Sequence, residues 1–160
     1  MSTAVIQRKA ARAILLTPKA EVLLMRVRLE GVAPFWMTPG GGLEAGETTA
    51  DGLRRELKEE VGLDQLRIGP LLWRLQHSYD FHGKRYCQDE EYFVVHVPRF
   101  NPRIEDETEA KEIYGFRWWT ISELLNATER ITPFSLANII QTYLREGPPK
   151  EEPRIEVLVD

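Results

Sequence analysis

Three consecutive glycines at positions 40–42 constrain this chain more than any other feature of its sequence. Because glycine has no Cβ atom, three in succession predict a permissive loop rather than the interior of a strand or helix. Thr48 or Thr49 can cap a helix after this loop, and Gly62 suits a left-handed helix end. The sequence therefore predicts a glycine loop that leads into one helix ending at about Val61.

The predicted helix has an apolar side and an acidic side. Its apolar residues recur every fourth position and form one stripe that can pack on a sheet, namely Leu53, Leu57 and Val61. Glu56, Glu59 and Glu60 project beside this stripe at i, i+3 and i+4, so their carboxylates repel one another when all are ionised.

Protons, basic neighbours or a divalent cation can offset that repulsion. A group of carboxylates prefers to bind Mg²⁺, Mn²⁺ or Ca²⁺. The predicted helix contains no histidine, the ligand type that would favour zinc. The plain alternative is a solvated acidic face paired with the basic residues Arg54, Arg55 and Lys58. A glycine loop before such a helix lets backbone groups approach a metal or a phosphate closely, so a metal–phosphate site is the favoured interpretation.

The flanking segments predict a mixed α/β domain over residues 8–145, with a mobile or partner-packed tail at residues 146–160. Strand-like runs, separated by turns at residues 18–20 and 82–84, occupy residues 9–17, 21–28, 66–81, 85–97 and 114–119. Residues 101–112 are polar and acidic and predict a loop. Residues 120–123 have capping-box spacing for a short helix, and Pro133 opens a final helix that closes near Gly147.

Charge and cysteine content narrow the classes of partner. A formal charge of -4 and a pI of about 5.5 argue against binding to a nucleic acid polymer, because such proteins usually carry a basic stripe. The single cysteine, Cys87, forms neither a disulfide framework nor a multi-thiolate zinc site, which favours a reducing, cytoplasmic setting. No apolar stretch approaches about 20 residues, so we expect neither secretion nor a membrane partner.

The segment from Gly41 to Leu63 resembles the signature of the Nudix hydrolase family (MutT-like). That signature is Gly, five residues, Glu, seven residues, Arg-Glu, an aliphatic, any residue, Glu-Glu, any residue, Gly, an aliphatic. Here it is filled without departure by Gly41, Glu47, Arg55-Glu56-Leu57, Glu59-Glu60 and Gly62-Leu63. The resemblance implies an α/β/α sandwich with a mixed β-sheet. It also implies a Mg²⁺-dependent pyrophosphatase, with Mn²⁺ as a possible substitute, in which water attacks phosphorus in a nucleoside diphosphate derivative.

The resemblance also assigns roles to residues of this segment. Glu59 and Glu60 resemble the principal Mg²⁺ ligands, and Glu56 resembles a metal ligand or the base that deprotonates the attacking water. Gly40 is expected to offer its backbone carbonyl to the metal.

Other residues near the glycine loop are expected to order it or to meet the substrate. Arg55 and Glu47 resemble the pair that ties the loop to the helix, although each could be an ordinary surface charge. Gly41 and Gly42 are expected to meet the substrate.

Residues outside the segment complete the predicted site. A further acidic metal ligand is expected from Glu112, in preference to Glu109, with Glu90 and Glu91 as second candidates; a solvated acidic loop is the alternative. Arg26 and Arg28 end a strand near the glycine loop and are candidates for substrate phosphate, with surface placement equally open. Two roles are open for a set of aromatic residues, stacking on the base of a substrate or packing in the hydrophobic core: Phe35, Trp36, Tyr79, Phe81, Tyr86 and Tyr92.

Two other functions fit the same fold. One is an isopentenyl-diphosphate-isomerase-like enzyme, which would use Cys87. The other is a non-catalytic, nucleotide-sensing Nudix domain, which commonly loses the carboxylates that this sequence keeps. The sequence leaves the diphosphate substrate and a possible homodimer open.

Overall fold

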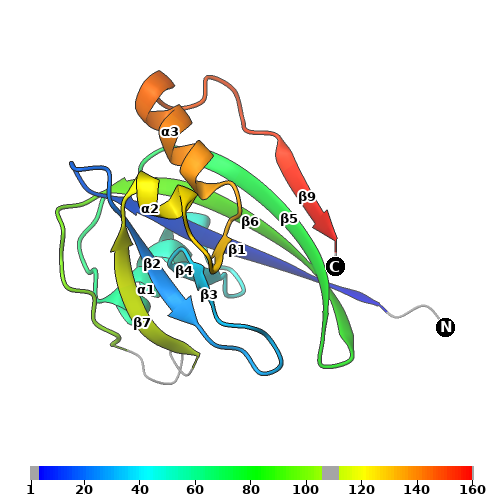
Figure 1. Ribbon diagram of the computed structural model, residues 1–160. Coiled ribbons are helices and arrows are strands. Elements are labelled where there is room, and N and C mark those ends of the chain that lie inside the picture. Colours follow the sequence, from blue (N-terminus) through cyan, green and yellow to red (C-terminus); the bar gives the residue numbers. More distant parts are fainter. Residues whose placement is uncertain (1–3, 106–111, 160) are drawn as a thin grey trace.

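The computed structural model describes residues 4–105 and 112–159 (Figure 1). Within these residues the elements follow the order β1 (Val5–Leu16), β2 (Val22–Val27), β3 (Phe35–Met37), β4 (Gly40–Gly42), α1 (Thr49–Val61), β5 (Leu71–Phe81), β6 (Lys84–His96), β7 (Ile113–Trp119), α2 (Ile121–Leu125), β8 (Arg130–Thr132), α3 (Leu136–Glu146) and β9 (Ile155–Val159).

The strands form one mixed sheet in the order β8-β3-β2-β1-β6-β5-β9, with β4 paired to β1 and β7 to β2. β1 runs parallel to β6 along its whole length, but it pairs with β2 only at Leu16 and Val22. Away from that point β4 occupies the other edge of β1, opposite residues 10–12. The glycines are therefore held beside the middle of a buried strand.

Helices cover both faces of the sheet, as Figure 1 shows. Alternate residues of β1 point to opposite faces: Ile14 and Leu16 belong to the core under α2 and α3, whereas Ala13 and Leu15 belong to the core under α1. On the α1 side the core includes the predicted stripe of Leu53, Leu57 and Val61, each at most 1% exposed. The expected α/β/α sandwich with a mixed sheet is confirmed.

The helix that follows the glycines has the predicted ends. The Thr48 side chain accepts a hydrogen bond from the Asp51 N–H at 3.1 Å, and Gly62 closes the helix in the left-handed region at φ 73°. The short helix α2 has the predicted capping box between Thr120 and Glu123.

The expectation that the three glycines form a loop and not a strand is wrong, because they form β4. The Ala13 N–H donates to the Pro39 carbonyl, and the Leu43 N–H donates to the Lys9 carbonyl, at 2.8 and 2.9 Å. At Gly40, with φ 133°, a Cβ atom would lie 2.1 Å from the Ala11 carbonyl oxygen. Glycine here permits a strand pairing too close for any side chain.

Three other boundaries differ from the sequence-based expectation. The strand expected from residue 66 begins at Leu71, after Pro70, which has no N–H to donate. The last helix begins at Leu136, three residues after the Pro133 expected to open it. The expected tail includes β9, whose alternating β-branched residues favour a strand and which lies parallel to β5. No helix of the described residues is long and apolar enough to cross a membrane.

Candidate active site

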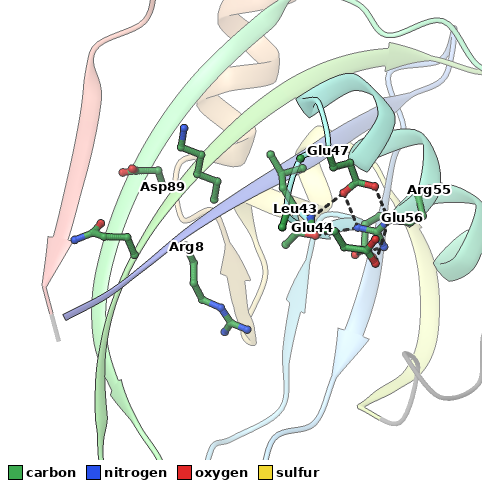
Figure 2. A pocket seen from close by; sticks show the side chains of 12 residues that line it. Arg8, Leu43, Glu44, Glu47, Arg55, Glu56 and Asp89 are labelled. Carbon is green, nitrogen blue, oxygen red and sulfur yellow. Dashed lines mark hydrogen bonds and ion pairs between the residues drawn. The ribbon is translucent and has the colours of Figure 1, made fainter. Parts of the chain in front are cut away.

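An arginine and a glutamate tie the end of the glycine strand to α1. Arg55 binds Glu47 through two hydrogen bonds, at 2.8 Å from Nε and 3.0 Å from Nη2 (Figure 2). Nη2 also donates to the Gly42 carbonyl at 3.0 Å, and the Glu44 N–H donates to Glu47 at 2.9 Å. The hydrogen bond from Arg55, followed by the one from Glu44, lowers the pKa of Glu47 to about 2. The loop is thus fixed to the helix as predicted.

The same guanidinium reaches two carboxylates of the predicted metal set. Arg55 Nη1 lies 3.0 Å from Glu56 Oε1 and 3.3 Å from Glu59 Oε2. The hydrogen bond to Glu47 and the charge of Glu56 raise the pKa of Arg55, although its partial burial opposes them. One cation therefore lies among three carboxylates and offsets part of their repulsion.

Glu60 is buried like Glu56, whereas the other acidic residues of α1 are not. Its side chain accepts a hydrogen bond from the Gly40 N–H at 2.9 Å, and the residue is 7% exposed. Burial, followed by the nearby charge of Glu56, raises the pKa of Glu60 to about 8, although Arg12 opposes the shift. A hydrogen bond with Glu56 adds to this rise in the pKa of Glu60.

Gly41 gives the Glu56 carboxylate its space. A Cβ atom at this position would lie 2.7 Å from Glu56 Cδ and 2.8 Å from Oε1. The glycine strand therefore presses directly against the carboxylate pair, without any intervening side chain.

The carboxylate pair suits a divalent cation, because a cation can neutralise two acidic groups that are both buried. Within residues 4–105 and 112–159, no three His, Cys, Asp or Glu side chains are already grouped so as to hold a metal ion. Glu59 and Glu56 bind the same Arg55 nitrogen, Nη1, at 3.3 and 3.0 Å.

A buried arginine that the sequence analysis missed completes this region. Arg12 Nη1 donates to the Gly40 carbonyl at 2.9 Å, and Nη2 pairs with Glu90 at 3.2 Å. Burial alone would raise the pKa of Glu90, but Arg12 and the Tyr92 hydroxyl hold it below its usual range. The available signal was one charged residue within the apolar run AARAILL.

The predicted residues outside α1 are placed less closely around the carboxylates. Glu112 is exposed in a turn before β7, where its backbone carbonyl accepts a hydrogen bond from the Arg28 N–H; Glu109 lies outside the described residues. Arg26 pairs with Glu129 at 2.9 Å, and the Arg28 guanidinium lies 4.5 Å from the centre of the Tyr114 ring. Both arginines already have partners.

A cleft of about 850 Å³ opens beside the Arg55 cluster. Figure 2 shows Glu47, Arg55 and Glu56 on one side of it, and Arg8 and Asp89 projecting from the sheet on the other. Its lining residues are Gln7, Arg8, Lys9, Gly42, Leu43, Glu44, Ala45, Gly46, Glu47, Arg55, Glu56 and Asp89. The cleft offers room for a nucleotide-sized molecule.

Comparison with known proteins identifies the family. The NUDIX domain matches residues 6–140 of the chain. The chain belongs to the NUDIX family. The residues from Gly41 to Leu63 are accordingly its Nudix box, and the expected assignment to a Nudix pyrophosphohydrolase is confirmed.

Curated relatives support the same assignment. The RNA pyrophosphohydrolase of Helicobacter pylori (strain ATCC 700392 / 26695) is 30% identical over 135 residues, which cover 76% of this chain and 80% of that one. The RNA pyrophosphohydrolase of Sulfurovum sp. (strain NBC37-1) is 31% identical over 124 residues, which cover 70% and 75%.

Solved structures share the fold. The MutT protein from Methanosarcina mazei Go1 aligns with a TM-score of 0.67 at 20% identity and covers 92% of this chain and 100% of that one. The NUDIX domain of Shewanella oneidensis NrtR, complexed with ADP ribose, also aligns with a TM-score of 0.67, at 16% identity and with 89% and 90% covered. At such identities the likeness extends to the fold alone.

Proposed function

We propose that this Nudix enzyme hydrolyses a diphosphate linkage in a nucleotide derivative, with Mg²⁺ bound by Glu56, Glu59 and Glu60. The observation that carries the proposal is the buried pair of Glu56 and Glu60 against the glycine strand, where Glu60 accepts from the Gly40 N–H and Glu56 fills the space beside Gly41. Two buried carboxyl groups side by side destabilise the folded protein unless a bound cation neutralises them. Their placement therefore favours a role in cation binding over a role in folding.

Some residues of the box are proposed to bind the metal ion, and one is proposed to take part in the reaction itself. Glu60 and Glu59 serve as the principal ligands, and Glu56 serves as a ligand or accepts the proton of the attacking water. The Gly40 carbonyl, which already accepts from Arg12, has a second lone pair with which it can join them. When bound, Mg²⁺ neutralises diphosphate oxygens and lowers the pKa of a coordinated water.

The residues around the box hold this arrangement and receive the substrate. Arg55 and Glu47 keep the loop and the carboxylates in place. Gly42, which has no side chain, lines the cleft that receives the substrate. Glu112 remains our candidate for a further metal ligand. Arg26 and Arg28 remain candidates for phosphate contacts, which would require Arg26 to leave Glu129.

We propose a small nucleotide-like diphosphate as substrate, and a 5′-polyphosphorylated RNA end as the second candidate. The overall charge of -4 supports the small molecule, since extended contact with an RNA backbone needs a basic surface. The names of the curated relatives support the RNA end. An RNA end presents the same phosphoric anhydride to the box, so both substrates require the same chemistry.

A substrate panel tests the proposal. The protein with Mg²⁺ is incubated with nucleoside triphosphates, nucleotide sugars, ADP-ribose, dinucleoside polyphosphates and a 5′-triphosphorylated RNA oligonucleotide in ¹⁸O-labelled water. We expect release of phosphate or pyrophosphate with label on one phosphorus, and loss of most turnover in a folded Glu60→Gln variant. Full turnover by that variant would contradict the site, and absence of hydrolysis across the panel would favour a nucleotide sensor.

The isomerase alternative has little support from the position of Cys87. This residue lies on β6 opposite Gln7 and Ser78, and it is outside the residues that line the 850 Å³ cleft. Replacing Cys87 with alanine should therefore leave hydrolysis unchanged.

A further inference from the structure

A buried arginine joins the sheet to the glycine strand. Arg12 is 8% exposed, and its guanidinium donates in two directions, to the Gly40 carbonyl at 2.9 Å and to Glu90 at 3.2 Å. A buried ion pair is rarely more stabilising than apolar residues of the same volume, because both charges lose their hydration. Stability therefore does not explain why an arginine interrupts the apolar face of β1.

The neighbouring strand fixes the orientation of this arginine. Glu90, which is 7% exposed, accepts hydrogen bonds from the Tyr92 hydroxyl and from Gln88 Nε2, the latter at 2.6 Å. Together with Arg12, these donors leave the Glu90 carboxylate little freedom to turn. Glu90, one of the two second candidates for a metal ligand, is thus in contact with Arg12.

The backbone at Gly40 links this network to the carboxylate pair through the peptide groups on its two sides. Arg12 binds the Gly40 carbonyl, and the Gly40 N–H binds Glu60 Oε1 at 2.9 Å. Because a Cβ atom on Gly40 would lie 2.1 Å from the Ala11 carbonyl oxygen, the peptide is also packed tightly on β1. A chain of contacts thus runs from Glu90 through Arg12 and Gly40 to Glu60.

We propose that Arg12 is a positioning residue that fixes the backbone at Gly40 and, through it, the carboxylate of Glu60. This inference rests on the proposed metal site. Arginine suits the role because its planar fork binds two acceptors at a fixed angle, whereas lysine presents a single ammonium group. Loss of this fork leaves Glu60 free to turn away from Glu56, which weakens cation binding and slows turnover.

The test compares variants that remove the network in different ways. Arg12→Met combined with Glu90→Leu deletes both charges and leaves no unpaired buried ion. Arg12→Lys keeps the charge but not the fork, and Tyr92→Phe removes one hydrogen bond to Glu90. Arg99→Met, which breaks an ion pair with Glu21 away from this region, serves as the control.

Each variant is examined by thermal unfolding, by Mn²⁺ binding followed with electron paramagnetic resonance, and by kcat at saturating Mg²⁺. We expect the double variant to bind Mn²⁺ at least about tenfold more weakly and to lose at least about tenfold in kcat. Arg12→Lys should fall between the double variant and the wild type, and Arg99→Met should match the wild type.

Two results separate this inference from the function on which it rests. Wild-type Mn²⁺ affinity and kcat in a folded double variant, or in Arg12→Lys, would overturn the positioning role and leave the metal site intact. A wild-type protein that binds no Mn²⁺ would overturn the metal site and the positioning role with it. Should the double variant not fold, Mn²⁺ affinity and kcat of Arg12→Lys and Tyr92→Phe test the positioning role in its place.

Discussion

Adding one methyl group at Gly41 should move a carboxylate of the active site without disturbing the fold. The new Cβ atom would lie 2.7 Å from Glu56 Cδ, which is 0.7 Å short of an ordinary contact of 3.4 Å (3.4 − 2.7). Gly41 does not have positive φ, so the alanine backbone itself is unstrained. The carboxylate, at the end of a side chain, has to give way.

A displacement of this size predicts a large kinetic effect. Misplacing a catalytic group by about 1 Å costs on the order of 100-fold in rate. For Gly41→Ala we therefore expect kcat to fall by roughly 10- to 100-fold, or about 1.4–2.7 kcal/mol of barrier. The unfolding midpoint should stay close to that of the wild type, because the clash involves a movable side chain and no backbone atom.

Gly42→Ala provides the matched comparison. Its Cβ atom would have its nearest neighbour, the Lys9 carbonyl oxygen, at 3.9 Å, and Gly42 also lacks positive φ. We expect this variant to lose far less than Gly41→Ala when kcat is measured at saturating Mg²⁺. Equal losses in the two variants, or wild-type kcat in Gly41→Ala, would refute the reasoning.

Three further predictions follow from the loop and the helix end. Arg55→Lys loses the two-point contact with Glu47, so kcat should fall by about tenfold or more in a steady-state assay, and a wild-type rate would count against the clamp. Because the pKa of Glu47 is lowered, its contribution to the free energy of unfolding is complete above about pH 4.5 and is lost as the pH falls toward about 2. In thermal unfolding measured across this pH range, Glu47→Gln should therefore lose less stability on acidification than the wild type. Gly62→Ala forces alanine to φ 73° with Cβ 2.9 Å from the Arg103 carbonyl oxygen, so denaturant unfolding should show a loss of roughly 1–2 kcal/mol, and an unchanged midpoint would contradict this.

Local signals in the sequence predicted the helix and its loop clamp. Thr48 and Gly62 define α1 because capping and left-handed closure depend on single residues. Arg55 and Glu47 are in contact, with Glu47 just before the start of α1 and Arg55 within its second turn. The mixed α/β class followed from the order of elements, since a helix with one apolar stripe has to bury it on a sheet, whereas the α/β/α sandwich came from the resemblance to the Nudix family.

Features that depend on distant strands were beyond such local signals. The glycines form a strand only because β1 and β2 diverge and leave an edge of β1 open at residues 10–12. Arg12 meets Glu90, 78 residues away, through a parallel pairing of β1 with β6 that no local pattern specifies. β9 required β5 to expose a free edge, which the sequence of the last residues does not reveal.

The most direct test of the central claim is titration of the purified protein with Mn²⁺, followed by electron paramagnetic resonance, alongside Glu56→Gln and Glu60→Gln. We predict one or more saturable sites in the wild type and at least about tenfold weaker binding in either variant, with cooperative unfolding retained in both. Equal Mn²⁺ affinity in all three proteins, or no binding by the wild type, would contradict the proposal that the carboxylates of α1 hold the catalytic metal.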